Sequence, residues 1–464
     1  MEREGKPTVL IVAKGFEADA RFNAQHEGLS DLPLVVLPQA VVPLPQEIAA
    51  TGLGKTVATA VVNGLTREAT AASSTEAKTA VAERLTFRGE SYDDAVASME
   101  RFFLQNCWSD GLPLIPPAPE AVNWMLEATE LSPQHVLGTV EPGGNEATIE
   151  KVAVNAVMAG CLPTYFPVVV AAVEAMVDPR FDLRGVQCTA GLVSPLPIVS
   201  GLKLIEQLNI NDSFSTIGPG WRANATIGRA IRLIMINLGL SWPGRNDMKS
   251  FGTPFKYVTL MAENERGYEG VWEPIRVTEG FSPDEATVSL MPACSWGLER
   301  CRSEDATTEK MVALLCRQAK AKYDNNADSW GMDDLVLLSP AAFEIFRKEG
   351  RSRADIQQAI YENARIPSVQ FFGGREPSDD YGPKPLPRAL LEQCRRNPQT
   401  MVPLLEKPEG VKIVVAGGPG PRMMAYVGNW GFGPAYFVTK PVKLPANWTE
   451  LLKKYQGWET PVIR

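Results

Sequence analysis

The chain has 464 residues, with 46 Lys or Arg and 54 Asp or Glu, and a formal net charge of -8. This acidic balance makes nucleic acid and anionic membranes poor partners, because both attract positively charged surfaces. The length is enough for roughly two or three domains of ordinary size. No apolar stretch approaches the ~18 residues of a membrane span. The first residues, MEREGK, also lack the apolar region of a signal peptide, so we expect a cytoplasmic location.

Histidine and cysteine usage restricts the chemistry further. The chain has two histidines, His26 and His135, so a His-rich metal site or a histidine-based catalytic triad has little material. The seven cysteines are odd in number and contain no Cys-x-x-Cys pair. We therefore expect mostly free thiols in a reducing compartment.

The chain opens with the pattern of a parallel β-α-β unit, residues 1–65. Apolar runs at Val9–Ala13 and Leu32–Pro38 predict two buried strands, and Phe16, Ala20 and Ala24 between them fall at helical spacing. Two parallel strands alone cannot bury both faces of a sheet. We therefore expect later segments of this chain, or a small partner subunit, to complete the unit.

The remaining pattern predicts an α/β protein. Residues 66–90 are polar and rich in alanine, as is typical of a linker. Ser91 followed by Asp94 indicates a capped helix that begins a large mixed α/β domain, residues 91–325. A C-terminal α/β segment, residues 326–464, contains a strand at Val411–Ala416. We expect this strand to pair with the opening unit and help complete its sheet.

The first candidate site residue is Cys161, in NAVMAGCLPTYFP. We expect Gly160 to close one helix and Pro163 to open the next, which places Cys161 just before a helix N-terminus. Unpaired amides there lower the pKa of a thiol and favour the nucleophilic thiolate. The alternative is a small buried residue that fills the corner between two helices.

A second candidate is GPGWRANATIGRA, residues 218–230. We expect Asn224 to cap a helix over residues 224–238, with Arg222 and Arg229 near its first turns. Helix amides and arginines together receive carboxylate or phosphate groups. The structural alternative is a glycine turn before a capped helix with surface arginines.

The third candidate is CWSDGLPLIPP, a proline-constrained loop. Asp110 would serve as an acid or base, with Trp108 and Ser109 lining the pocket. Alternatively, Asp110 begins a turn before Gly111. A weaker pattern is AGGPGPR at Ala416–Arg422, which follows a predicted strand. Its backbone amides would form an anion nest, or the segment would be a structural turn.

Several of these segments resemble one known family. The stretch TVLIVAKGFEADARFNAQHEGLSDLPLVVLPQ, residues 8–39, resembles the second half of the domain of UGSC-motif (seleno)proteins, which are named for a selenocysteine- or cysteine-containing tetrapeptide. The stretches WSDGLPLIPP, EKVAVNAVMAGCLPTYFPVVVAAVEA, GPGWRANATIGRA and VVAGGPG look like the larger domain that accompanies it. The resemblance supports Cys161, Trp108, Asp110, Arg222 and Asn224 as pocket residues. The tetrapeptide itself is absent from the 464 residues, so the resemblance implies that a separate subunit supplies the redox centre.

These patterns together predict an enzyme subunit with thiol-dependent chemistry, either redox or addition-elimination, on a small anionic or carbonyl-bearing molecule. In this interpretation Arg222, Asn224 and Arg229 bind the anion, Cys161 is the nucleophile and Asp110 moves a proton. The alternatives are a non-catalytic scaffold subunit of a hetero-oligomer and a metal-dependent lyase or hydrolase with Cys, Asp and Glu ligands. The sequence identifies no cofactor.

Overall fold

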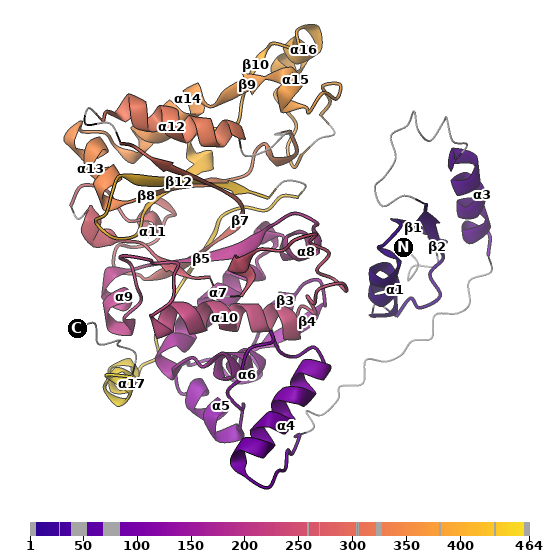
Figure 1. Ribbon diagram of the computed structural model, residues 1–464, viewed down its shortest axis with the longest axis vertical. Coiled ribbons are helices and arrows are strands. Elements are labelled where there is room, and N and C mark those ends of the chain that lie inside the picture. Colours follow the sequence, from indigo (N-terminus) through magenta and orange to yellow (C-terminus); the bar gives the residue numbers. More distant parts are fainter. Residues whose placement is uncertain are drawn as a thin grey trace.

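A computed structural model describes residues 6–26, 28–38, 53–67, 84–257, 259–268, 270–302, 304, 306–321, 327–379, 382–430 and 433–458. Most of the predicted linker, residues 68–83, lies outside these ranges. Helices and mixed sheets make the chain an α/β protein, as the sequence predicts (Figure 1).

The opening unit has the predicted β-α-β order. Strand β1 (Leu10–Ala13) and strand β2 (Leu34–Leu37) pair in parallel, with Leu10 opposite Leu34, and helix α1 (Glu17–His26) connects them. Helix α3 (Leu53–Leu65) packs closely on this unit, because a Cβ on Gly64 would lie 2.5 Å from Cγ2 of Val9. In the described residues this sheet has two strands only.

A seven-stranded mixed sheet forms the centre of the rest of the chain. Its strand order is β11-β8-β12-β7-β5-β6, and β13 also pairs with β7. The strands are β5 (Ser194–Ser200), β6 (Met261–Ala262), β7 (Thr287–Arg300), β8 (Asp334–Leu338), β11 (Val411–Val415), β12 (Met423–Asn429) and β13 (Val438–Pro441). They come from both sides of the predicted boundary between residues 325 and 326.

The predicted pairing of the C-terminal strand with the opening unit is wrong. Strand β11 pairs in parallel with β8, with Val411 opposite Asp334 and Val415 opposite Leu338. Both strands are buried along nearly their whole length. The apolar run at Val411–Ala416 therefore reflects burial inside the large sheet, which gives no information about the identity of the neighbouring strand.

The large sheet encloses one apolar core and packs against two others. Leu196, Met291 and Leu335 belong to a core that both halves of the sheet share. Side chains alternate between the two faces of a strand, so the neighbouring Val336 and Leu338 reach a second core, with the helices that follow β8. Val288 and Leu290 of β7 reach a third core, with the helices that precede β7.

Helices cover the sheet in two groups (Figure 1). One group contains α6 (Ile149–Ala159), α7 (Phe166–Met176) and α10 (Arg222–Asn237), and the other contains α12 (Thr308–Ala321), α13 (Pro340–Lys348) and α14 (Arg353–Asn363). The other helices are α4 (Tyr92–Gln105), α5 (Pro119–Leu126), α8 (Leu183–Cys188), α9 (Leu202–Leu208), α11 (Ile275–Thr278), α15 (Ser368–Phe371), α16 (Arg388–Arg396) and α17 (Trp448–Tyr455). Small antiparallel pairs are formed by β3 (Val136–Val140) with β4 (Asn145–Thr148), and by β9 (Arg365–Pro367) with β10 (Met401–Pro403).

Local helix signals in the sequence are confirmed in several places. Ser91 and Asp94 form a reciprocal capping box at the start of α4. Gly160 ends α6 in the left-handed conformation, with φ of 86°. Pro163 opens a short 3-10 turn, Pro163–Tyr165, and the α-helical part of the next segment begins only at Phe166.

Within the described part of the chain, no helix combines the length and the apolar character that crossing a bilayer requires.

Helix α10 is held in place by a close approach at Gly228. A Cβ at this position would lie 2.7 Å from both the backbone nitrogen and the backbone oxygen of Thr259. Such distances are below van der Waals contact, so only glycine lets the helix lie against this segment.

We predict that Gly228→Ala destabilises the protein, although alanine favours a helix interior by about 1 kcal/mol over glycine. The expected cost of overpacking is about 1–3 kcal/mol, which lowers the midpoint of thermal unfolding. Gly410→Ala is the matched control, because its new Cβ would meet nothing nearer than 3.9 Å. Equal midpoints for Gly228→Ala and the unmodified protein would contradict the packing described above.

Candidate functional site

Asp110 and Arg229 form a buried ion pair that joins the proline-rich loop to α10. Arg229 donates from Nε to Oδ2 of Asp110 at 2.7 Å and from Nη2 to Oδ1 at 2.9 Å. The two side chains are 13% and 3% exposed. Arg229 also donates to the carbonyl oxygen of Leu112 at 3.1 Å. This bidentate geometry fixes the loop on the helix, and the carboxylate that Arg229 receives comes from the protein itself.

The two residues that precede Asp110, Trp108 and Ser109, make contacts within the fold. The buried Ser109 accepts a hydrogen bond from the amide of Gly111 at 3.0 Å, as in a turn. Trp108 packs edge-on against Phe102 and Phe103, with ring centroids 5.7 and 5.6 Å away, and remains 40% exposed. These contacts fit the structural interpretation of the loop as well as they fit a pocket wall.

The surroundings of Cys161 disfavour the predicted thiolate. Cys161 is buried, and burial raises the pKa of its thiol to about 12. A hydrogen bond with Thr226 and the charges of Arg222 and Arg229 act in the opposite direction but are smaller effects. The structure therefore keeps this thiol protonated, because desolvation outweighs the nearby positive charges.

Asn224 does not cap α10, contrary to the prediction. The helix begins at Arg222, and Trp221 occupies the N-cap position without a side-chain cap. Asn224 is buried in the first turn, where its Oδ1 accepts from the amide of Asn211 at 2.8 Å and its Nδ2 donates to the carbonyl oxygens of Asn211 and Thr216. Its role in the structure is to hold the preceding loop against the helix.

Arg222 contacts the end of α6. It donates from Nε and Nη2 to the carbonyl oxygen of Gly160 at 3.2 and 3.1 Å. This oxygen belongs to the C-terminus of a helix, where a positive charge is favourable. The structure thus brings Arg222, Cys161, Arg229 and Asp110 to one side of α10.

A second cluster on α10 was not found from the sequence. Arg232, one turn beyond Arg229, is buried together with Asp247, Lys249 and Lys256. Asp247 lies 3.5 Å from Arg232 Nη2, 3.5 Å from Lys249 Nζ and in direct contact with Lys256 Nζ. We call these four residues the cation cluster. None of their side chains is more than 10% exposed.

The cation cluster has more positive than negative charge. Burial, with a smaller contribution from Arg232, lowers the pKa of Lys256 to about 6 and that of Lys249 to about 8. The contact with Asp247 favours the charged form of Lys256 and opposes this shift. Buried cations in excess of their counterions either release protons or bind an anion. The cluster is therefore a candidate site for a small anion, or for an amine that exchanges its proton near neutral pH.

Polar groups surround the cation cluster and order it. Lys249 donates to the carbonyl oxygens of Val186 and Gln187, at 3.0 and 2.9 Å, at the end of α8. The side chain of Gln187 accepts from Ser241 Oγ at 2.7 Å and from Arg232 Nη1 at 3.4 Å. Lys249 and Arg232 thus have neutral partners in addition to Asp247.

The opening unit touches the loop that carries this cluster. Asn23 of α1 donates from Nδ2 to Oδ1 of Asn246 at 2.8 Å, and Asn246 directly precedes Asp247. Burial raises the pKa of Asp19, also on α1, and Arg184 acts on it in the opposite direction. Burial, and secondarily the negative charge of Asp19, raises the pKa of Cys188 to about 11. Helix α1 therefore lies beside the cation cluster and beside Cys188.

The sequence contained a partial signal for the cation cluster. Arg222, Arg229 and Arg232 are spaced by seven and three residues, which places them on one side of a helix. Asp247, Lys249 and Lys256 follow in a polar loop, and nothing in their local pattern distinguishes buried side chains from solvated ones. Among the described residues, no group of three His, Cys, Asp or Glu side chains could hold a metal ion.

A comparison with protein families matches the opening unit. The UGSC family model matches residues 1–67, the segment that contains β1, α1, β2 and α3. This match confirms the resemblance of the opening unit to that family. The resemblance of the later stretches lies outside the matched residues and stays a prediction. No curated protein matches the chain.

We predict that Asp110→Asn lowers the free energy of unfolding by about 3 kcal/mol or more, because it leaves the Arg229 charge buried without a counterion. Urea denaturation measures this change. In the double variant, Asp110→Asn with Arg229→Gln, we expect part of the loss to be recovered. Glu127→Gln, which removes the partner of Lys454 in a pair that is almost half exposed, is the control and should cost at most about 1 kcal/mol. An Asp110→Asn cost no larger than this control would be inconsistent with a structural ion pair.

We predict that Cys161 in the folded protein reacts very slowly with iodoacetamide. Its raised pKa means that the folded chain holds the thiol proton more strongly than the unfolded chain, so labelling stays slow until the pH approaches about 12. After unfolding, the rate should follow an ordinary thiol pKa of about 8.5. Mass spectrometry of the labelled peptides at pH 7.5 and 9.5 measures both rates. Half-buried Cys107 is the internal control, and labelling of folded Cys161 as fast as Cys107 would show that the thiol is activated.

Proposed function

We propose that the chain is an enzyme subunit that binds a small anionic, carbonyl-bearing molecule at the cation cluster. The observation that carries the proposal is the burial of Arg232, Lys249 and Lys256 around one carboxylate, that of Asp247. A carboxylate or similar anion would balance the excess positive charge. The binding residues of this proposal differ from the predicted set, because Arg229 is already paired with Asp110 and Asn224 is used in the fold.

The proposed nucleophile is a thiol or selenol of a second subunit. Burial raises the pKa of Cys161 and Cys188, the cysteines near α10 and α1, and so disfavours their thiolates. The two-stranded opening unit offers a place for a partner, since a parallel pair of strands is not a complete sheet. The contact between Asn23 and Asn246 would bring that partner near the cation cluster.

Addition to the carbonyl carbon is the reaction class that this arrangement supports best. The partner's thiolate or selenolate would form a bond to the carbonyl carbon. The π-electron pair of the carbonyl group would move to its oxygen, which would become an alkoxide. The ammonium of Lys256 would give its proton to that oxygen, since its lowered pKa suits proton transfer near neutral pH. The neighbouring cations would stabilise the developing negative charge.

A scaffold without catalytic activity is the second candidate. One observation favours it: Lys249 already donates to two backbone carbonyl oxygens and contacts Asp247, as a structural lysine does. In that case the cation cluster would order the loop against α8, and the opening unit would only attach a partner. Turnover by the purified complex distinguishes the two candidates.

We predict that the full-length chain binds glyoxylate, the probe chosen because it has both a carboxylate and an aldehyde. Isothermal titration calorimetry measures the affinity, and we expect Lys256→Met to weaken it at least about tenfold through loss of a charge-assisted contact. Lys443→Met is the control, because Lys443 is 68% exposed and pairs with Glu174 on the surface. Equal affinities for Lys256→Met and the unmodified chain, or no saturable binding, would overturn the proposed site.

A further inference from the structure

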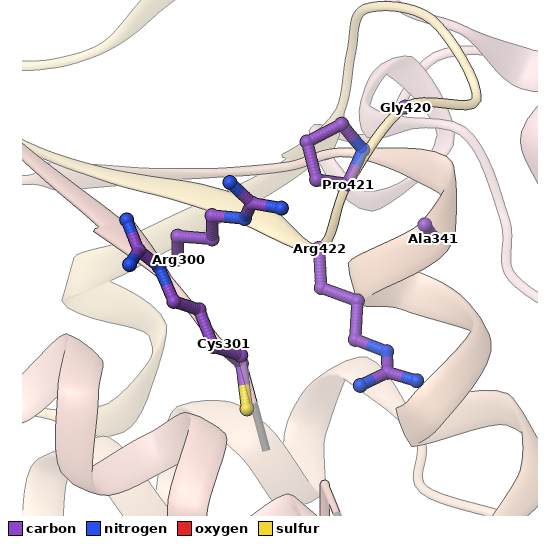
Figure 2. Close-up of a pocket in the computed structure, with 7 residues that line it drawn as sticks. Arg300, Cys301, Ala341, Gly420, Pro421 and Arg422 are labelled. Atoms are coloured by element: carbon purple, nitrogen blue, oxygen red, sulfur yellow. The ribbon is translucent and has the colours of Figure 1, made fainter. Parts of the chain in front are cut away.

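A groove lined by basic side chains lies at the C-terminal end of β7 (Figure 2). The pairing with β5 involves the other end of this strand. Arg300 is the last residue of β7, Arg302 follows it, and Arg422 directly precedes β12. Lys310 and Arg317 on α12 line the same region. We call these five residues the arginine groove.

Two adjoining cavities make up this groove. One, of about 520 Å³, is lined by Arg300, Cys301, Arg302, Ala341, Gly420, Pro421 and Arg422. The other, of about 420 Å³, shares Arg300, Cys301 and Arg302 and extends to α12. The two cavities thus adjoin each other at these three residues. Figure 2 shows the side chains of Arg300 and Arg422 extending from the two adjacent segments that border it.

Hydrogen bonds to the backbone fix the segments that border the groove. The amide of Cys301 donates to the carbonyl oxygen of Arg422 at 3.1 Å. Ser339, at the start of α13, donates from Oγ to the carbonyl oxygen of Pro421 at 3.0 Å and accepts from the amide of Met423 at 3.0 Å. The glycine-rich stretch AGGPGPR is therefore an ordered turn, and its last residue contributes a basic side chain to the groove.

The arginines of the groove differ in their acidic partners. Glu299 accepts two hydrogen bonds from Arg317, at 2.9 and 2.7 Å, and is nearly buried in doing so. Arg300 and Arg302 are exposed, and neither has a carboxylate partner within the described part of the chain. No acidic residue lines either cavity in the described residues. Guanidinium groups in this arrangement match the oxygens of a phosphate group.

We propose that the arginine groove binds a phosphorylated small molecule. The phosphate groups contact Arg300 and Arg302, and an apolar part of the ligand packs against Ala313 and Leu314 in the second cavity. A small ligand fits better than nucleic acid, because the chain as a whole has a net charge of -8 and repels a long polyanion. This site uses none of the residues of the cation cluster, so it does not depend on the function proposed above.

Calorimetry with inorganic pyrophosphate, on the full-length chain in phosphate-free buffer, tests the proposal. We expect saturable binding at one site, weakened about tenfold by Arg300→Gln and again by Arg302→Gln, since each removes a charge-assisted contact. Affinity should also fall with added salt. Arg388→Gln is the matched control and should bind normally, because Arg388 is 92% exposed on α16 and pairs with Glu392.

Three further outcomes would overturn the proposal. One is the absence of saturable binding, or an unchanged affinity in the double variant Arg300→Gln with Arg302→Gln. Another is a loss of pyrophosphate binding in Lys256→Met with normal binding in the arginine variants, which would place the anion in the cation cluster. A short single-stranded oligonucleotide that binds through the same arginines and that excess pyrophosphate cannot displace would show that the groove serves nucleic acid instead.

Discussion

The backbone hydrogen bonds of β7 join the two halves of the large sheet. Its first residues pair with β5 and β13, and its last residues pair with β12. The shift from one set of partners to the other falls near Ala293, where β12 also has an irregularity between Gly428 and Asn429. A bulge of this kind bends a strand and increases its twist. The strands β5, β12 and β13 therefore take their places in the sheet from this one long strand.

The charge state of an ionisable side chain in this protein depends on its burial more than on its distance from neighbouring charges. Cys161 lies near two arginines and still has a raised pKa, whereas Asp110, almost fully buried, is held by a bidentate arginine. A thiol loses more from desolvation than distant charges return, and a carboxylate in direct contact with a guanidinium is compensated. The cation cluster is intermediate, since one carboxylate lies among three basic side chains and burial lowers the pKa of both lysines. That imbalance is the physical basis of the proposed function.

Local patterns predicted local structure. Ser91 and Asp94 form the expected capping box, and the apolar runs became strands. Errors arose where the answer depended on distant residues. Val411–Val415 is a strand, but its partner is β8. Asn224 is of a residue type that often caps helices, but its side chain bonds to Asn211, thirteen residues earlier. The cation cluster forms where α8, α10 and a later loop meet. No short stretch of the sequence shows that these segments lie together.

In the described part of the opening unit, the sheet of β1 and β2 has open edges. Among the described residues, neither outer edge of β1 or β2 has a strand partner, and Ile11 and Val36 are 47% and 41% exposed. An open edge of this kind accepts another strand through its unpaired amides and carbonyl oxygens, whether the strand comes from a different protein or from a second copy. Solubility of the chain should therefore depend on stoichiometry: an excess of this chain over any edge-filling partner favours self-association.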